Sequence, residues 1–347
     1  MDSKRWLALD VFKTIAVFVM VAWHLSIWWV NLHPSIEKGL LMVGVTPWPY
    51  LLQVIVAFSG HFVMSIPVIA GGALRFYMDK SDSSRGNKLL AAVLKRAAAL
   101  ACLGFVMNFL AFGIGYWHLW NTLQLISLSI AIITVFMVYS SPYLLAISGF
   151  LAIFSAPFIR NLLGNTHNYF SFMLIGDRFG DNIWAVFPWY GVVVYGFLFV
   201  HLYLRFKDGH MKKRLKLFLL GAGFFVIAAA LAKNKFFYAV DFQYPWGPLL
   251  FQPHTLTVLA QLSVFTVLII MIDFFSSRMR TMRFGIVNVF SKGILWIYVV
   301  HMIVGFRLIE FLLDSGFHNN AVLFPVMVFS FALSYGVGAL AVLKKAK

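Results

Sequence analysis

Charged residues, and acidic ones above all, are scarce in this chain. Only 12% of its 347 residues are charged while 61% are hydrophobic, and 28 Lys and Arg stand against 12 Asp and Glu. Soluble domains carry about 25% charged residues. The composition therefore excludes a chain that folds as one large water-soluble core.

Cysteine is nearly absent as well. The single cysteine, Cys102, lies inside an apolar run, so the sequence contains neither a disulfide framework nor a cysteine-based metal motif. We expect Cys102 to be a small packing residue rather than a nucleophile, and we expect no metal in the functional site.

Apolar runs of about 20 residues, the length that spans a bilayer, fill most of the chain instead. The ten candidate spans cover residues 6–30, 50–74, 89–114, 119–139, 142–159, 184–204, 215–232, 255–273, 286–312 and 321–342. They predict an all-α, polytopic transmembrane protein, with residues 1–347 forming a single transmembrane domain.

The positions of the basic residues predict the topology. If the N-terminus is cytoplasmic, the clusters at 75–96 and 205–216 and the final KKAK lie on the same side, and the opposite side receives few cations. The positive-inside rule then places both termini in the cytoplasm. The formal net charge of +16 thus indicates the lipid bilayer, and not nucleic acid, as the partner. We expect an integral, multi-pass protein of a bacterial inner membrane.

The first span carries three ionisable residues in an otherwise apolar run. Asp10 and Lys13 are three residues apart, a spacing at which side chains pair on a helix. His24 follows Lys13 by 11 residues, which is about three turns, so the two side chains point the same way about 16 Å apart. They cannot share one proton, and if both are functional they line two depths of one polar channel.

Each of these residues also has a purely structural interpretation. Lys13 lies about two turns from the cytoplasmic end, so its ammonium can snorkel to the headgroups. His24 stands beside Trp23 and Trp28 and can belong to an aromatic belt at the far interface. Ionisable groups inside a membrane are functional candidates by default, but the first span alone leaves both interpretations open.

The stretch LDVFKTIAVFVMVAWH (9–24) resembles the first-span signature of two related families of membrane acyltransferases. These are the acyltransferase-3 family and the heparan-glucosaminide N-acetyltransferase-like family. Asp10 and His24 stand at signature positions, whereas Lys13 replaces the usual arginine and Thr14 the glycine after it. An ammonium lacks the planar fork of a guanidinium, so a bidentate grip on an anion is lost at Lys13.

Three later segments resemble the same families in the same order. They are WNTLQLISLS (120–129), FPWYGVVVYGF (187–197) and WIYVVHMIV (296–304). Apolar helices match one another easily, so each segment is weak by itself, but the four together extend over nearly the whole chain.

The resemblance implies an enzyme that takes an acyl group, commonly acetyl, from cytoplasmic acyl-CoA. The group passes to a hydroxyl or amine of a glycan or glycolipid at the opposite membrane face. Such a transfer needs a base, and neutral imidazole titrates near working pH. We assign His24 as general base or transient acyl carrier, with Lys13 as a channel cation and Asp10 beside it.

Acyl-CoA, the co-substrate that the resemblance implies, needs cations for its phosphates. Arg75, Lys95 and Arg96 lie at the cytoplasmic ends of the second and third spans and are our candidates, although the same cations also serve to fix the topology. Gln124 is a further candidate contact. Gln124 and Asn108 are equally typical of residues that hydrogen-bond between membrane helices.

His61, Trp189 and His301 are candidate contacts of the acceptor. His61 lies near the middle of the second span, where Pro67 and the Gly71–Gly72 pair are expected to loosen the helix. Broken membrane helices are tolerated where they line a cavity. A hydrogen-bonded packing histidine explains His61 about as well.

The remaining polar residues have simpler interpretations. Arg307 and Glu310 are three residues apart and are expected to pair near the outer end of their helix. Histidines at or beyond helix ends are expected to be surface or interface residues, namely His118, His201, His210 and His254.

Two other classes of function stay open. A secondary transporter or flippase for an anionic or sugar-linked substrate would use Lys13, His24 and His61 to bind a proton or that substrate. The weak symmetry between the two halves of the chain disfavours a repeat-built transporter. A non-catalytic membrane scaffold is the third class. A homo-oligomer is compatible with all three.

Overall fold

The computed structural model of the protein describes residues 6–32, 65–80, 86–163, 169–175, 184–206, 209–233, 253–276 and 285–344. No strand occurs among these residues, and nine helices within them are long and apolar enough to cross a membrane. These helices confirm the all-α, polytopic membrane class. The predicted span at 50–74 lies mostly outside the described residues, so the count of ten stays a prediction.

The chain divides into two compact units, each built from segments that are distant in sequence. The first comprises Met1–Val63, Phe109–Ile114 and Leu268–Lys347, and the second comprises Met64–Asn108 and Gly115–Val267.

The helices of the first unit are α1 (Leu7–Leu32), α12 (Gly285–Val300), the π-helical turn η4 (His301–Gly305), α13 (Phe306–Asp314), the 3-10 turn η5 (Asn320–Val322) and α14 (Leu323–Lys344). The second unit holds α3 (Ser65–Lys80), α5 (Thr122–Tyr139), α6 (Pro142–Leu163), α7 (Tyr169–Ile175), α8 (Val186–Arg205), α9 (Gly209–Ala232) and most of α4 (Gly86–Phe112) and α11 (Thr255–Ser276). The short turn η3 (Ile114–Tyr116) lies where the two units divide.

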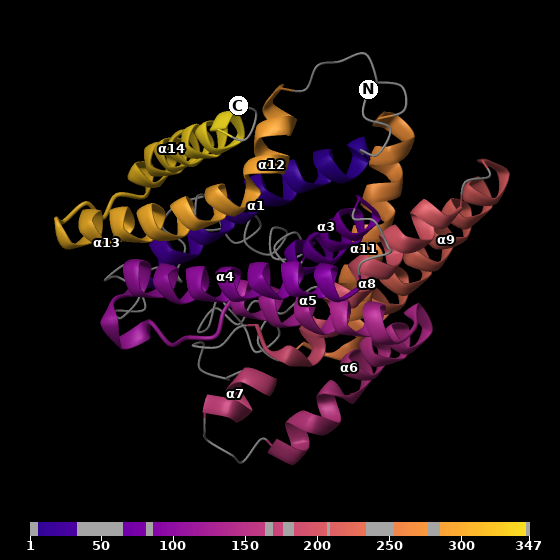
Figure 1. The fold of residues 1–347 in the computed structure, drawn as a ribbon. Coiled ribbons are helices and arrows are strands. Elements are labelled where there is room, and N and C mark those ends of the chain that lie inside the picture. The colour runs from indigo at the N-terminus through magenta and orange to yellow at the C-terminus, as the bar shows by residue number, and fades with distance from the viewer. Residues whose placement is uncertain are drawn as a thin grey trace. The chain divides into compact units, whose positions relative to one another are not determined.

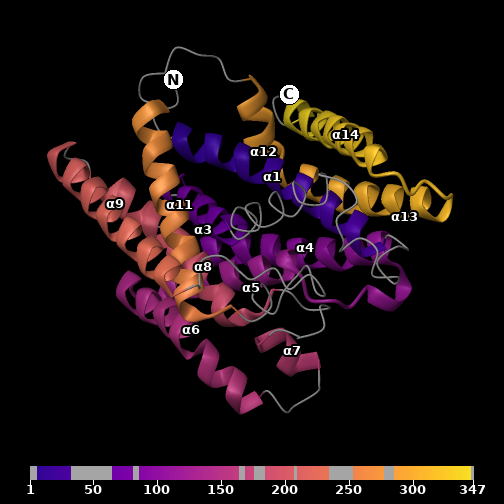
Figure 2. The same cartoon turned by 180° about the vertical axis from the view of Figure 1, so that it is seen from behind.

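In the first unit, α1 lies along α12 and also contacts α13 and α14 (Figures 1 and 2). Four of the buried residues of α1 are spaced three or four positions apart, namely Leu9, Phe12, Ala16 and Met20, which is the spacing of a packed helix face. Phe18, on another face, is 54% exposed. This periodicity turns one side of α1 toward its neighbours in the unit.

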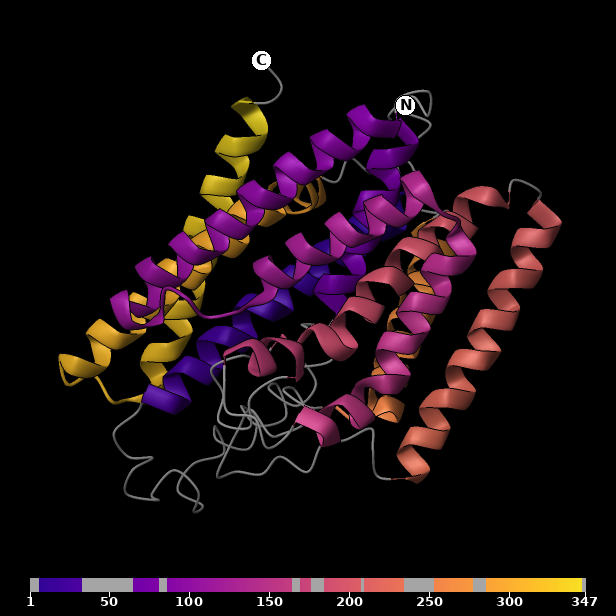
Figure 3. The ribbon, with the colours of Figure 1, turned by 60° about the horizontal axis from the view of Figure 1, so that its bottom comes forward.

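In the second unit, α8 packs against α3, α5 and α6 (Figure 3). Two glycines of α8 allow the closest approaches. A Cβ on Gly196 would lie 1.9 Å from the Val68 carbonyl oxygen of α3, and one on Gly191 would lie 2.5 Å from the Gly149 carbonyl oxygen of α6. Small residues at such crossings are how membrane helices bring their backbones together.

Two predictions about this unit are wrong. The Gly71–Gly72 pair does not loosen its helix, because α3 runs unbroken from Ser65 to Lys80. Gly71 instead allows the backbone of α8 to come close, since a Cβ on Gly71 would lie 1.9 Å from the Val193 carbonyl oxygen. Cys102 is exposed on α4 and is therefore not a packing residue of the core.

Candidate active site

Two histidines from opposite ends of the chain meet in the first unit. His24 lies on α1 and His301 is the first residue of η4. The Nδ1 atom of His24 is 3.0 Å from Nε2 of His301, and Nδ1 of His301 is 3.0 Å from the Ile297 carbonyl oxygen. His301 is fully buried. The structure thus brings together the predicted base and a residue that we had assigned only to the acceptor.

Aromatic rings hold both imidazoles in place. The Trp28 ring stacks on His24 with centroids 5.2 Å apart and planes 15° apart, and Tyr298 meets His301 edge-on at 5.4 Å. Packing on this scale restricts rotation of the two imidazole rings. Trp28 therefore helps to hold the histidine pair, in addition to any role in an aromatic belt.

His301, which contacts His24 of α1, begins a π-helical turn. Single π turns within α-helices are frequent at functional sites. Gly305, which ends this turn, packs so closely on α1 that a Cβ there would lie 2.7 Å from Leu25 Cδ2 and 3.2 Å from the Trp28 ring. No feature of the segment at 296–304 predicted this turn.

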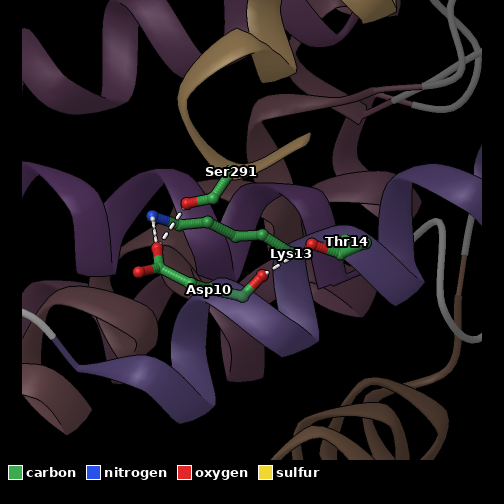
Figure 4. A network of polar contacts seen from close by, with 4 residues as sticks. All are labelled: Asp10, Lys13, Thr14 and Ser291. Atoms are coloured by element: carbon green, nitrogen blue, oxygen red, sulfur yellow. Dashed lines mark hydrogen bonds and ion pairs between the residues drawn. The ribbon is translucent and has the colours of Figure 1, made fainter. Parts of the chain in front are cut away.

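Asp10 is the centre of a second polar cluster in the first unit (Figure 4). The Lys13 ammonium lies 3.6 Å from Asp10 Oδ1, with side-chain exposures of 14% and 9%, which confirms the predicted pair. The Ser291 hydroxyl of α12 donates to the same carboxylate, and the Thr14 hydroxyl donates to the Asp10 carbonyl oxygen at 2.9 Å. The ammonium of Lys13 is therefore accompanied by a carboxylate, and its use as a channel cation stays a prediction.

Arg75 is held by two partners in the second unit. Its Nε donates to Nδ1 of His201 at 3.1 Å, and its NH1 lies 3.5 Å from Asp79 Oδ1. His201 is predicted to be a surface or interface residue, and that prediction did not include its contact with Arg75. Its ring is half-buried because α8 packs along α3 and places His201 against Arg75.

The other two cations assigned to acyl-CoA are more exposed. The Arg96 guanidinium lies over the Tyr77 ring, 4.1 Å from its centroid, in a cation–π contact. Lys95, its neighbour on α4, is exposed. Arg75 thus lies close to Asp79 and Arg96 lies close to Tyr77, and both of these partners belong to α3. Contact with a phosphate stays a prediction for all three cations.

Gln124 belongs to a polar cluster at the start of α5. Its Oε1 accepts the Asn121 backbone N–H at 3.3 Å while Asn121 Oδ1 accepts the Leu123 N–H at 3.0 Å, a capping box. Asn108 of α4 donates to the Leu119 carbonyl at 2.7 Å and accepts from the Asn121 amide. Asn108 therefore links α4 to the segment that begins α5, as predicted for an interhelical residue, and Gln124 as an acyl-CoA contact stays a prediction.

Trp189 is fully buried near the start of α8, with its ring edge-on to Trp184 at 5.2 Å. Its indole N–H has no hydrogen-bond partner among the described residues. Trp189 as a contact of the acceptor stays a prediction, and His61 lies outside the described residues.

Two contacts in these clusters were not predicted from the sequence, namely that of Ser291 with Asp10 and that of His201 with Arg75. Both partners are distant along the chain, by 281 and 126 residues, so no local pattern signals them. In the described parts of the chain, no group of three or more His, Cys, Asp or Glu side chains is arranged to hold a metal ion.

These helices and polar clusters define a multi-pass membrane protein with a histidine pair at its candidate reactive site. The family model described as heparan-alpha-glucosaminide N-acetyltransferase, catalytic, matches residues 5–218, more than half of the 347 residues. The chain therefore belongs to this family, which confirms the resemblance and identifies an acetyltransferase-type membrane enzyme. No curated protein and no solved structure matches the chain significantly.

Proposed function

We propose that the protein moves an acetyl group from cytoplasmic acetyl-CoA to a hydroxyl or amine of a glycan or glycolipid at the opposite membrane face. The name of its family includes a glucosaminide, so an amino sugar is the first acceptor to test. The proposal places the enzyme in the inner membrane of a bacterium.

One observation carries this proposal. His24 lies inside the matched family segment, and its Nδ1 is engaged with His301 at 3.0 Å. An imidazole with one nitrogen engaged and the other available is the arrangement that general bases of acyl transfer use. A histidine that only packs in an aromatic belt needs no such partner.

The chemistry requires one proton to move twice. The other ring nitrogen of His24, Nε2, removes the proton of the acceptor hydroxyl or amine as the acceptor attacks the thioester carbonyl. The new carbon–oxygen or carbon–nitrogen bond forms, the carbon–sulfur bond breaks, and His24 returns the proton to the departing thiolate. His24 is neutral before and after the cycle.

The remaining sequence-assigned residues have binding roles in this proposal. Arg75, Lys95 and Arg96 neutralise the phosphates of the co-substrate, and Gln124 contacts it. Trp189 and His61 bind the acceptor. Substitution of these residues should raise KM more than it lowers kcat, because binding that is equal in ground and transition states acts on KM.

The test measures release of free CoA from acetyl-CoA by purified protein in nanodiscs, with an amino-sugar acceptor. We expect His24→Ala to lower kcat by about 10²- to 10⁴-fold, the usual contribution of a general base, while the variant still inserts, folds and binds acetyl-CoA. The matched control is His118→Ala, because His118 is an exposed histidine without an assigned role.

Three outcomes contradict parts of the proposal. A purified protein that neither binds acetyl-CoA nor releases CoA from it is not this enzyme, and uptake of an anionic substrate would then support the transporter. Full turnover by His24→Ala would overturn the assignment of the base. A trapped acetyl-histidine at position 24 would replace the base with an acyl carrier.

A further inference from the structure

The contacts of His301 determine which of its nitrogens carries a proton. A carbonyl oxygen can only accept a hydrogen bond, and the Ile297 carbonyl oxygen lies 3.0 Å from His301 Nδ1. Nδ1 of His301 is therefore the protonated nitrogen. Because His301 is fully buried and burying a charge is costly, its ring is neutral, and its Nε2 carries a lone pair.

The same reasoning extends to His24. Nε2 of His301 accepts, so Nδ1 of His24, 3.0 Å away, must donate. This direction holds whether His24 is neutral or protonated, since an imidazolium has a proton on both nitrogens. In the neutral form of His24, Nε2 is left as the nitrogen with the lone pair.

We propose that His301 is a positioning residue that holds His24 in the tautomer with the proton on Nδ1. His24 Nε2 then takes the acceptor proton and returns it to the CoA thiolate, while the proton on His24 Nδ1 and the one on His301 Nδ1 stay in place. This assignment rests on the proposed function for its catalytic consequence. It replaces contact with the acceptor as the role of His301.

The fold supports a positioning role in two further ways. Gly305 lets α1 approach η4 closely enough for the two rings to meet, since a Cβ there would lie 2.7 Å from Leu25 Cδ2. Trp28 covers the His24 ring with planes 15° apart, which restricts the ring flip that would exchange its two nitrogens. Both features limit His24 to one orientation.

The first test reads the tautomer directly, without any substrate. Nitrogen NMR of ¹⁵N-histidine-labelled protein in nanodiscs distinguishes a protonated from a bare ring nitrogen, and the His24 signals are those lost in His24→Gln. We expect the neutral ring of His24 to be protonated on Nδ1 and bare on Nε2. A proton on Nε2 of neutral His24 in the wild-type protein would overturn the proposal.

The second test compares two amides at position 301. The oxygen of His301→Gln reaches the region of Nε2 and can accept from His24, whereas the shorter His301→Asn reaches only the region of Nδ1. We expect His301→Gln to keep the tautomer and to retain kcat within about tenfold. His301→Asn should lose the tautomer preference and lower kcat by on the order of 10²-fold or more, as misplaced tautomers do, with KM for acetyl-CoA unchanged.

The possible results test the positioning role of His301 and the proposed function separately. Equal kcat and equal His24 tautomer in the two amide variants would mean that His301 only packs, and would overturn the proposal. If His301→Asn fails to fold, the wild-type spectrum and the kcat of His301→Gln still decide. A wild-type protein with the expected tautomer but no acyl transfer would remove the proposed function and leave the proton arrangement standing.

Discussion

At position 13 this chain has lysine where the first-span signature has arginine. The structure supplies a reason why lysine is enough for the contact found there. The ammonium lies 3.6 Å from Asp10 Oδ1, and that carboxylate also accepts from Ser291. A point charge fits one carboxylate oxygen, and the planar fork of arginine is not required for that contact.

The pair makes Lys13 a structural as well as a candidate functional residue. Lys13→Met should remove the ammonium that lies 3.6 Å from Asp10 Oδ1 and lower the free energy of unfolding by about 3 kcal/mol, as breaking a buried ion pair does. The double variant Asp10→Asn/Lys13→Met should recover much of this loss, because a neutral amide of similar shape then replaces the carboxylate. Thermal unfolding of the purified variants in detergent measures both effects.

Lys13→Arg is the conservative control and should stay near wild-type stability. If the double variant is as unstable as the sum of the two single variants, the side chains are not energetically coupled. Any role of Lys13 would then not depend on its pairing with Asp10.

Pairs that are close in sequence could be predicted and distant pairs could not. Asp10–Lys13 and Arg307–Glu310 follow from the three-residue spacing, and Arg307 NH1 lies 2.6 Å from Glu310 Oε2. His24–His301 and Arg75–His201 join residues 277 and 126 positions apart. Only the packing of whole helices brings such side chains together. The sequence therefore predicted His24, His301 and Arg75 as site residues but did not predict which side chains contact them.

At the scale of the helices, the apolar runs predicted most spans to within a few residues. The span predicted at 142–159 is α6, Pro142–Leu163. The start of α9 differs more, because α9 begins at Gly209 instead of 215. Hydropathy marks only the apolar part of a helix, whereas α9 continues through basic turns in which Lys212 lies 3.5 Å from the Tyr203 ring centroid.

The glycine contacts of α8 make a sharp test of helix packing. Gly196→Ala should destabilise the protein by about 1–3 kcal/mol or more, because its Cβ would lie 1.9 Å from the Val68 carbonyl oxygen. Backbone atoms cannot move aside as a flexible side chain does, so α3 and α8 must separate. Thermal unfolding measures the loss.

Gly221→Ala on α9 is the matched control, since a Cβ there meets nothing within 4 Å. It should leave stability unchanged or raise it slightly, because alanine favours a helix by about 0.5–1 kcal/mol over glycine. Equal stability of the Gly196 and Gly221 variants would contradict the α3–α8 packing.

For the whole molecule, charge predicts orientation in the membrane. Exposed cations gather at the start of α4, at Lys88, Lys95 and Arg96, and at the start of α9, at Lys213 and Arg214. The positive-inside rule assigns these helix ends to the cytoplasm, the compartment that supplies acetyl-CoA in the proposed reaction. The sequence alone supported this orientation, because it depends on charge counts and not on tertiary contacts.

Acetyl transfer across sealed membrane vesicles is the measurement that tests the account most directly. Labelled acetyl-CoA, which does not cross the membrane, is added outside vesicles whose cytoplasmic face is outward, with an amino sugar enclosed. We predict labelled acetylated sugar inside the vesicles, a loss of about 10²-fold or more with His24→Ala, and none when the opposite face is outward. Equal labelling from either face, or labelling that persists in His24→Ala, would contradict the account.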